Sequence, residues 1–120
     1  MREVNSKISY NGKEYSIVFN LNVMEIIQEE YKTLEAWGEL TDGKAGEVNV
    51  KALIFGLTAM LNEGVEINNE KTGANEPLFT HKQVGRLLTE VGLENATKTM
   101  NNLVIDSTQT DEDKDKAKNA

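Results

Sequence analysis

Hydrophobic and polar residues alternate along the first twenty positions, on both sides of the pair Asn11-Gly12. An Asn-Gly pair is the strongest short signal for a hairpin, because a type I′ turn needs positive φ at both central residues. The turn predicts the pairs Tyr10–Lys13, Ile8–Tyr15, Ser6–Ile17 and Val4–Phe19. The apolar residues of the two arms then share one face. A lone hairpin is marginal in water, so we expect this face to pack on helices.

The spacing of apolar residues changes to three and four after the hairpin, which is typical of helices. Asn22 is the predicted N-cap of the first helix, with Glu25 completing a capping box. Apolar residues continue at helical spacing to Trp37, and Gly38 is the predicted stop. The sequence therefore predicts one helix over about residues 23–37.

A second helix is predicted after the N-cap Asn49, with the sequence VKALIFGLTAMLNE. It is apolar on nearly all sides, which is typical of a helix at the centre of a domain. Gly56 lies inside it and costs about 1 kcal/mol relative to Ala, which favours close packing of a neighbouring element there. Gly64 is the predicted C-terminal stop.

Residues 65–77 are polar and are predicted to form a mobile loop. Thr80 and Gln83 form a capping box for the next helix, which ends at Gly92, and a last helix starts near Leu93. Residues 106–120 have no aromatic side chain and only Ala as an aliphatic one, which favours disorder. We expect a mainly helical α+β domain over residues 1–105, an N-terminal β-hairpin packed on about four α-helices, and a disordered charged tail over 106–120.

Composition and charge narrow the classes of function. Thirteen Lys and Arg against twenty Asp and Glu give a net charge of −7, which disfavours binding to nucleic-acid phosphates. The chain has no cysteine, so thiolate catalysis and thiolate metal sites are excluded. The longest apolar stretch, about residues 52–61, is too short to span a bilayer, and the first residues lack the apolar region of a signal peptide. We expect a cytosolic protein that binds neither nucleic acid nor membranes.

No set of residues in the sequence indicates catalysis, a metal or a cofactor. His81 is the one histidine, and no cysteine or suitably placed serine accompanies it as a nucleophile. The loop over residues 41–49 resembles a calcium loop only superficially, because Lys44 and Leu53 stand where oxygen ligands are needed. Neither phosphate-binding glycine pattern is present. We therefore expect no catalytic residue, no metal, no cofactor and no enzymatic activity.

The order of several segments resembles a known family. These segments are ISYNGKEYSIVFNLNVMEIIQEEY, ALIFGLTAMLNEG and THKQVGRLLTEVG, followed by a charged end. They are similar to the tail assembly chaperones of long-tailed bacteriophages and prophages, in the variety found in Gram-positive hosts. The resemblance covers about residues 7–104.

The resemblance implies a function and partners. Members are mainly helical with a small β element, and they are non-virion proteins made in the host cytoplasm and absent from the mature virion. They bind the tape measure protein, keep it soluble and help recruit the tail tube protein. Self-association and a longer, frameshifted form are further features of such proteins.

Three side chains are candidate partner contacts because we expect them to be partly exposed. They are Leu34 and Trp37 at the end of the first predicted helix, and Phe79 beside the polar loop. An ordinary place in the core is the alternative for each, since large aromatic side chains both bury well and anchor interfaces.

Two other classes of function stay open. A structural tail or connector subunit would assemble into rings or tubes and be present in purified particles. A small acidic regulatory protein that mimics DNA would carry carboxylates along one face, whereas here acidic residues and lysines are interleaved.

Overall fold

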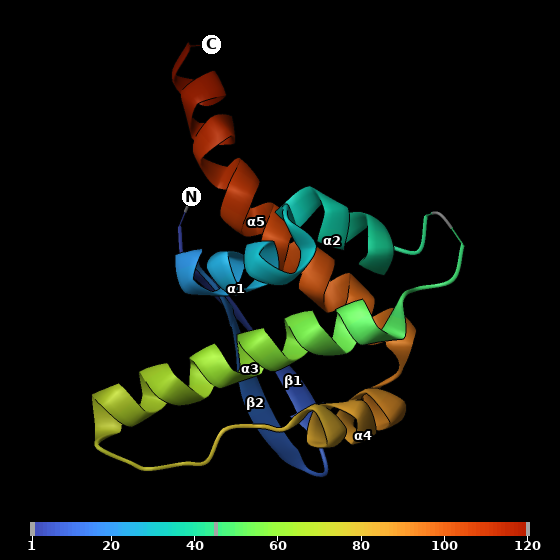
Figure 1. The fold of residues 1–120 in the computed structure, drawn as a ribbon. Helices are drawn as coiled ribbons and strands as arrows, with labels where there is room; N and C mark the ends of the chain where they lie inside the picture. Colours follow the sequence, from blue (N-terminus) through green and yellow to red (C-terminus); the bar gives the residue numbers. More distant parts are fainter. Residues whose placement is uncertain (1, 45, 120) are drawn as a thin grey trace.

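The structure, a computed structural model, describes the backbone of residues 2–44 and 46–119 and the side chains of residues 2–44 and 46–108. Within these residues the chain forms a hairpin followed by helices (Figure 1). The elements are β1 (Val4–Tyr10), β2 (Lys13–Phe19), α1 (Leu21–Tyr31), α2 (Leu34–Thr41), α3 (Val50–Thr72), α4 (His81–Val91) and α5 (Leu93–Asn119). The expected class, a mainly helical α+β fold with an N-terminal hairpin packed on helices, is confirmed.

The hairpin has the predicted turn and the predicted register. Asn11 and Gly12 have φ values of 56° and 77°, as a type I′ turn requires. The pairs run from Tyr10 opposite Lys13 to Val4 opposite Phe19. Exposed residues alternate with buried or half-buried ones along β1, so one face of this strand lies on the helices. In β2 burial instead increases away from the turn, and its last three residues, Ile17, Val18 and Phe19, are all buried.

Helix α3 lies at the centre of the arrangement (Figure 1). It contacts β2 of the hairpin as well as α1, α2 and α4, whereas α5 contacts β1 and α4. Its buried residues include Leu53, Leu57, Met60 and Leu61. The apolar surface of this helix on nearly all sides, which the sequence showed, therefore serves several neighbours at once.

The prediction of one long first helix is wrong in two respects. Asn20, and not Asn22, is the N-cap, because β2 ends at Phe19 and the Asn20 side chain accepts a hydrogen bond from the Val23 amide at 3.2 Å. The helix also stops at Tyr31. Lys32 has φ 72°, and the Thr33 amide donates to the Tyr31 carbonyl at 2.9 Å. This is a γ-turn, which redirects the chain.

A new helix, α2, begins directly after that turn. The Thr33 hydroxyl accepts from the Ala36 amide at 2.9 Å and so acts as its N-cap. Gly38 lies inside α2 and does not end a helix as predicted. Five helices therefore stand where about four were expected in the described part of the chain.

The predicted end of the central helix at Gly64 is also wrong. Asn49 caps α3 as predicted, with the Ala52 amide 3.0 Å from its side-chain oxygen, but the helix continues to Thr72. Gly64 is buried because α3 approaches β2 there: a Cβ on it would lie 2.7 Å from the Ser16 carbonyl oxygen. Gly73, with φ 73°, is the actual left-handed cap. Residues 65–72, expected to be loop, are helical.

Gly56 explains how α2 is held. A Cβ at this position would lie 2.3 Å from Cζ2 of Trp37, so the absence of a side chain makes room for the indole ring. The Trp37 Nε1 donates to the Ala52 carbonyl at 2.9 Å. The close packing predicted at Gly56 is confirmed.

The last two helices begin and end as predicted. Thr80 and Gln83 form the capping box of α4, Gly92 ends it, and α5 starts at Leu93. The Ser107 hydroxyl donates to the Arg2 carbonyl at 2.8 Å and is fully buried, so packed structure extends past residue 105. The backbone of α5 continues to Asn119, while the side chains from residue 109 onward lie outside the described residues, and the division into a domain and a tail stays a prediction.

Substituting Gly56 with Ala tests the role of the Trp37 site. The added methyl group overlaps the indole, and overpacking of this kind costs about 1–3 kcal/mol of unfolding free energy. Urea unfolding followed by the fluorescence of the single tryptophan measures it. Gly38→Ala in α2 is the control, because no atom lies within 4 Å of its added Cβ, and it should stabilise by up to about 1 kcal/mol. Equal effects of the two substitutions would contradict this account.

Candidate functional site

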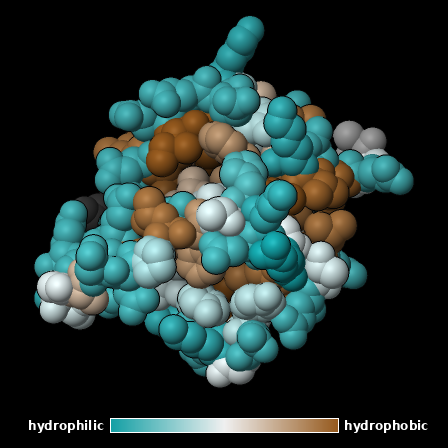
Figure 2. Space-filling model, turned by 60° about the horizontal axis from the view of Figure 1, so that its bottom comes forward, coloured by the Kyte–Doolittle hydropathy of each residue, from teal (hydrophilic) through white to brown (hydrophobic). Residues whose placement is uncertain are grey.

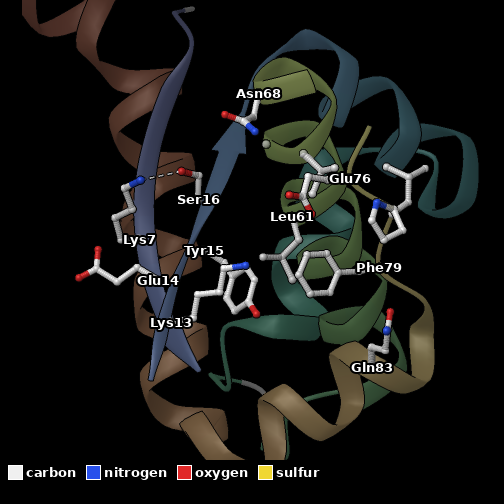
Figure 3. A pocket seen from close by; sticks show the side chains of 14 residues that line it. Lys7, Lys13, Glu14, Tyr15, Ser16, Leu61, Asn68, Glu76, Phe79 and Gln83 are labelled. Atoms are coloured by element: carbon white, nitrogen blue, oxygen red, sulfur yellow. Dashed lines mark hydrogen bonds between the residues drawn. The ribbon is translucent and has the colours of Figure 1, made fainter. Parts of the chain in front are cut away.

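A groove of about 460 Å³ lies between the hairpin and the chain segment that follows α3 (Figure 3). We call this segment, residues 73–80, the strap. One wall of the groove is the hairpin, the floor is α3, and the other wall is the strap. The lining residues are Lys7, Lys13, Glu14, Tyr15, Ser16, Leu61, Gly64, Val65, Asn68, Glu76, Pro77, Leu78, Phe79 and Gln83. A volume in this range is typical of ligand-binding clefts.

The strap is held against α3 by two asparagine side chains. Asn62 accepts from the Phe79 amide at 2.7 Å and donates to the Phe79 carbonyl at 3.2 Å. Asn69 accepts from the Glu76 amide at 3.0 Å and donates to the Glu76 carbonyl at 3.1 Å. Each amide group thus satisfies both backbone groups of one strap residue, as a neighbouring strand would. We call Asn62 and Asn69 the asparagine clamp.

Side-chain burial adds a single anchor to the strap. Residues 73–78 are exposed, and Phe79 is half-buried. Its ring meets that of Tyr15 edge to face, with centroids 5.3 Å apart, a preferred geometry for aromatic pairs. Figure 3 shows the two rings between the hairpin and the strap, with Leu61 of the groove floor beside them. The pair therefore joins the two walls.

Charged groups line both walls. The Lys13 ammonium lies 5.5 Å from the centre of the Tyr15 ring, a cation–π contact, and Lys7 donates to the Ser16 hydroxyl at 2.9 Å. Glu76 stands on the strap side. Polar groups thus surround a small apolar floor, and this combination suits a polypeptide with both polar and apolar side chains.

Of the three predicted contact residues, one lines the groove. Phe79 belongs to its strap wall, whereas Leu34 and Trp37 lie on α2, which is not one of its walls. Leu34 is half-buried against the core. Trp37 is only 1% exposed, so the expected partial exposure is wrong. The indole packs against Gly56 of α3, where no side chain is in the way. A partner-binding role for Leu34 and Phe79 stays a prediction.

Sequence reasoning missed the asparagine clamp. Asn62 and Asn69 are seven residues apart, which places them on the same side of a helix two turns apart. This spacing was visible in the sequence, but it had no meaning while the helix was predicted to end at Gly64.

Three rings, one each from α1, α3 and α4, lie close together outside the groove. Phe55 meets Tyr31 edge to face with centroids 5.5 Å apart, and the exposed His81 ring is 6.5 Å from Phe55. Burial, and to a lesser extent the neighbouring Glu30 carboxylate, raise the pKa of the Tyr31 phenol. The phenol therefore stays neutral at neutral pH.

Neither a cluster of metal-ligating side chains nor a membrane-spanning helix is found in the described part of the chain. Among its residues, no three His, Asp or Glu side chains are grouped as metal ligands. None of its helices has both the length and the apolar character needed to cross a bilayer. With the bottom of Figure 1 turned forward, apolar side chains form separate patches among hydrophilic ones (Figure 2).

Comparison of the chain with protein-family models, with curated proteins and with solved structures finds no match. Neither a relative nor a fold neighbour therefore supplies a function, and a proposal has to rest on the groove and on the sequence pattern.

A double-mutant cycle tests whether Phe79 ties the strap to the hairpin. Tyr15→Leu and Phe79→Leu each remove one ring of the edge-to-face pair, so the two effects on unfolding free energy should couple by about 1 kcal/mol. Urea unfolding of both single variants and the double variant measures this.

The control cycle pairs Phe79→Leu with Tyr10→Leu, since Tyr10 lies on the same hairpin face but on β1, beside the turn. Additive effects are expected there. Additivity in the Tyr15 cycle as well would show that the strap is not anchored through this pair.

Proposed function

We propose that the protein is a non-enzymatic tail assembly chaperone of a long-tailed phage or prophage, which binds the tape measure protein and keeps it soluble. The groove between hairpin and strap supports this proposal most directly, because it is a preformed cleft with polar and apolar lining, and the described residues contain no evident catalytic set. The resemblance of the sequence segments to that family supports the identity of the partner.

The physical properties of the chain fit this role. A tape measure protein is long and carries much apolar surface, which aggregates unless another protein covers it. A chaperone with a net charge of −7 adds like charge to the complex, and this favours its solubility and discourages contact with phage DNA. Recruitment of the tail tube protein is part of the same proposal, as is action in the host cytoplasm without incorporation into the virion.

Co-expression with the tape measure protein tests the proposal. We expect the tape measure protein to be soluble only when this chain is present, and the two to co-elute in size exclusion. If the tape measure protein stays insoluble and mass spectrometry finds this chain in purified tails, the structural-subunit alternative takes the place of the chaperone.

A pair of variants on α3 links this assay to the groove. Asn68 is exposed and lines the groove floor, so Asn68→Trp should fill the groove and lower the recovery of soluble partner at least about fivefold. Glu70→Trp is the matched control, because Glu70 is also exposed but points about 200° around the helix from Asn68. A loss of recovery in both variants, or in neither, would show that the partner does not bind in the groove.

A further inference from the structure

The asparagine clamp is built to recognise extended backbone. Asn62 and Asn69 are seven positions apart on the helix, which corresponds to a rise of about 10.5 Å. The strap residues that they hold, Glu76 and Phe79, are three apart, and three extended residues span about 10 Å. The two spacings match, so one face of α3 presents a pair of amides in register with an extended chain.

Recognition at the clamp uses the backbone of the strap. All four hydrogen bonds go to main-chain N–H and C=O groups, at 2.7–3.2 Å. Each strap residue from 73 to 78 is exposed, so its side chain contributes little to the contact. A segment of different sequence with the same extended path would make the same four bonds.

The strap is also weakly held at the asparagine clamp that it occupies. Phe79 is its one half-buried side chain, and its further hydrogen bonds lie at its two ends. The Gly73 amide donates to the Asn69 carbonyl at 2.9 Å and the Ala74 amide to the Thr72 hydroxyl at 3.2 Å, while the Thr80 amide donates to the Gln83 side chain at 2.8 Å. Segments with little apolar burial open at low free energy, ahead of the core. The clamp can therefore be vacated without unfolding α3, whose buried residues face the hairpin and the other helices.

We propose that the asparagine clamp is a binding site for an extended polypeptide segment, and that the strap fills it until a partner's segment takes its place. The site would bind main chain with little regard to side chains, which suits a partner that presents many different segments. This inference rests on the proposed function, because the partner meant is the tape measure protein, and the clamp would bind it in an extended conformation.

The test uses the full chain and two variants that release the strap in different ways. Glu76→Pro removes the N–H that Asn69 accepts, keeps the strap extended, and leaves both asparagines intact. Asn69→Ala removes both hydrogen bonds to the Glu76 backbone from the helix side and destroys half of the clamp. Each variant should speed hydrogen exchange of the Phe79 amide by at least about five- to tenfold, the effect of losing one hydrogen bond.

The probe is a capped peptide of residues 73–80, GANEPLFT, added at millimolar concentration and followed by the side-chain amide NMR signals of the clamp. In the intact chain the tethered strap competes at a comparable effective concentration and should reduce peptide binding. In Glu76→Pro the Asn62 and Asn69 signals should shift. In Asn69→Ala the shift of Asn62 should be at least about fivefold smaller. A second peptide with Ser at the places of Asn75 and Leu78 should bind within about twofold of the first.

Three results would overturn the proposal. Equal shifts of Asn62 in the two variants would show that the clamp does not recognise the peptide. No shift in Glu76→Pro, although Phe79 exchange shows an open strap, would show that the site accepts no segment in trans. Loss of binding by the second peptide would show that side chains are read.

Two safeguards keep the test decisive. If Glu76→Pro alters the fold, as judged by Trp37 fluorescence, insertion of two glycines after Gly73 loosens the strap instead. The peptide assay contains no tape measure protein, so its failure leaves the chaperone proposal standing, and the co-expression assay can fail independently.

Discussion

The close approach of α3 to its neighbours at two glycines is the constraint on which the rest of the structure depends. Gly56 admits the Trp37 ring and thereby fixes α2 on one side of the helix. Gly64 lets the helix touch the Ser16 carbonyl of β2 on another. Glycine lowers the helix propensity at each position by about 1 kcal/mol relative to Ala, but it allows packing that a side chain would block. The groove exists because the second approach places the hairpin beside the later turns of α3.

The sequence predicted those features that depend on local chemistry. Asn11-Gly12 set the register of the hairpin, because only a few residue pairs favour a type I′ turn. Asn49 and Thr80 were recognisable N-caps, since their side chains bond to amides three residues away. Sequence patterns of this kind act within one turn of the chain and need no tertiary information.

The errors arose where tertiary packing overrides local preference. Gly38 and Gly64 look like helix stops, yet both lie inside helices, and Gly64 is there because a strand lies against it. Lys32 carries no sequence signal for the γ-turn that divides the first predicted helix. The groove could not be predicted because its strap was assigned to a mobile loop. Only the full length of α3 brings Asn62 and Asn69 onto one face.

The proposed function places the partner on the face of the molecule that carries the groove and the clamp. Its walls are extended backbone, its floor is helical, and aromatic and charged groups lie side by side within it. A chaperone of the proposed kind needs no catalytic residues here; it needs a surface that binds another chain.

Site-specific cross-linking tests that claim most directly. The chain has no cysteine, so a single one at position 68, on the groove floor, can carry a photoreactive maleimide. The same probe at position 70 of the same helix points away from the groove. Position 68 should cross-link to the co-purified tape measure protein several times more strongly than position 70. Equal yields, or a stronger yield from position 70, would contradict the assignment of the groove as the binding surface.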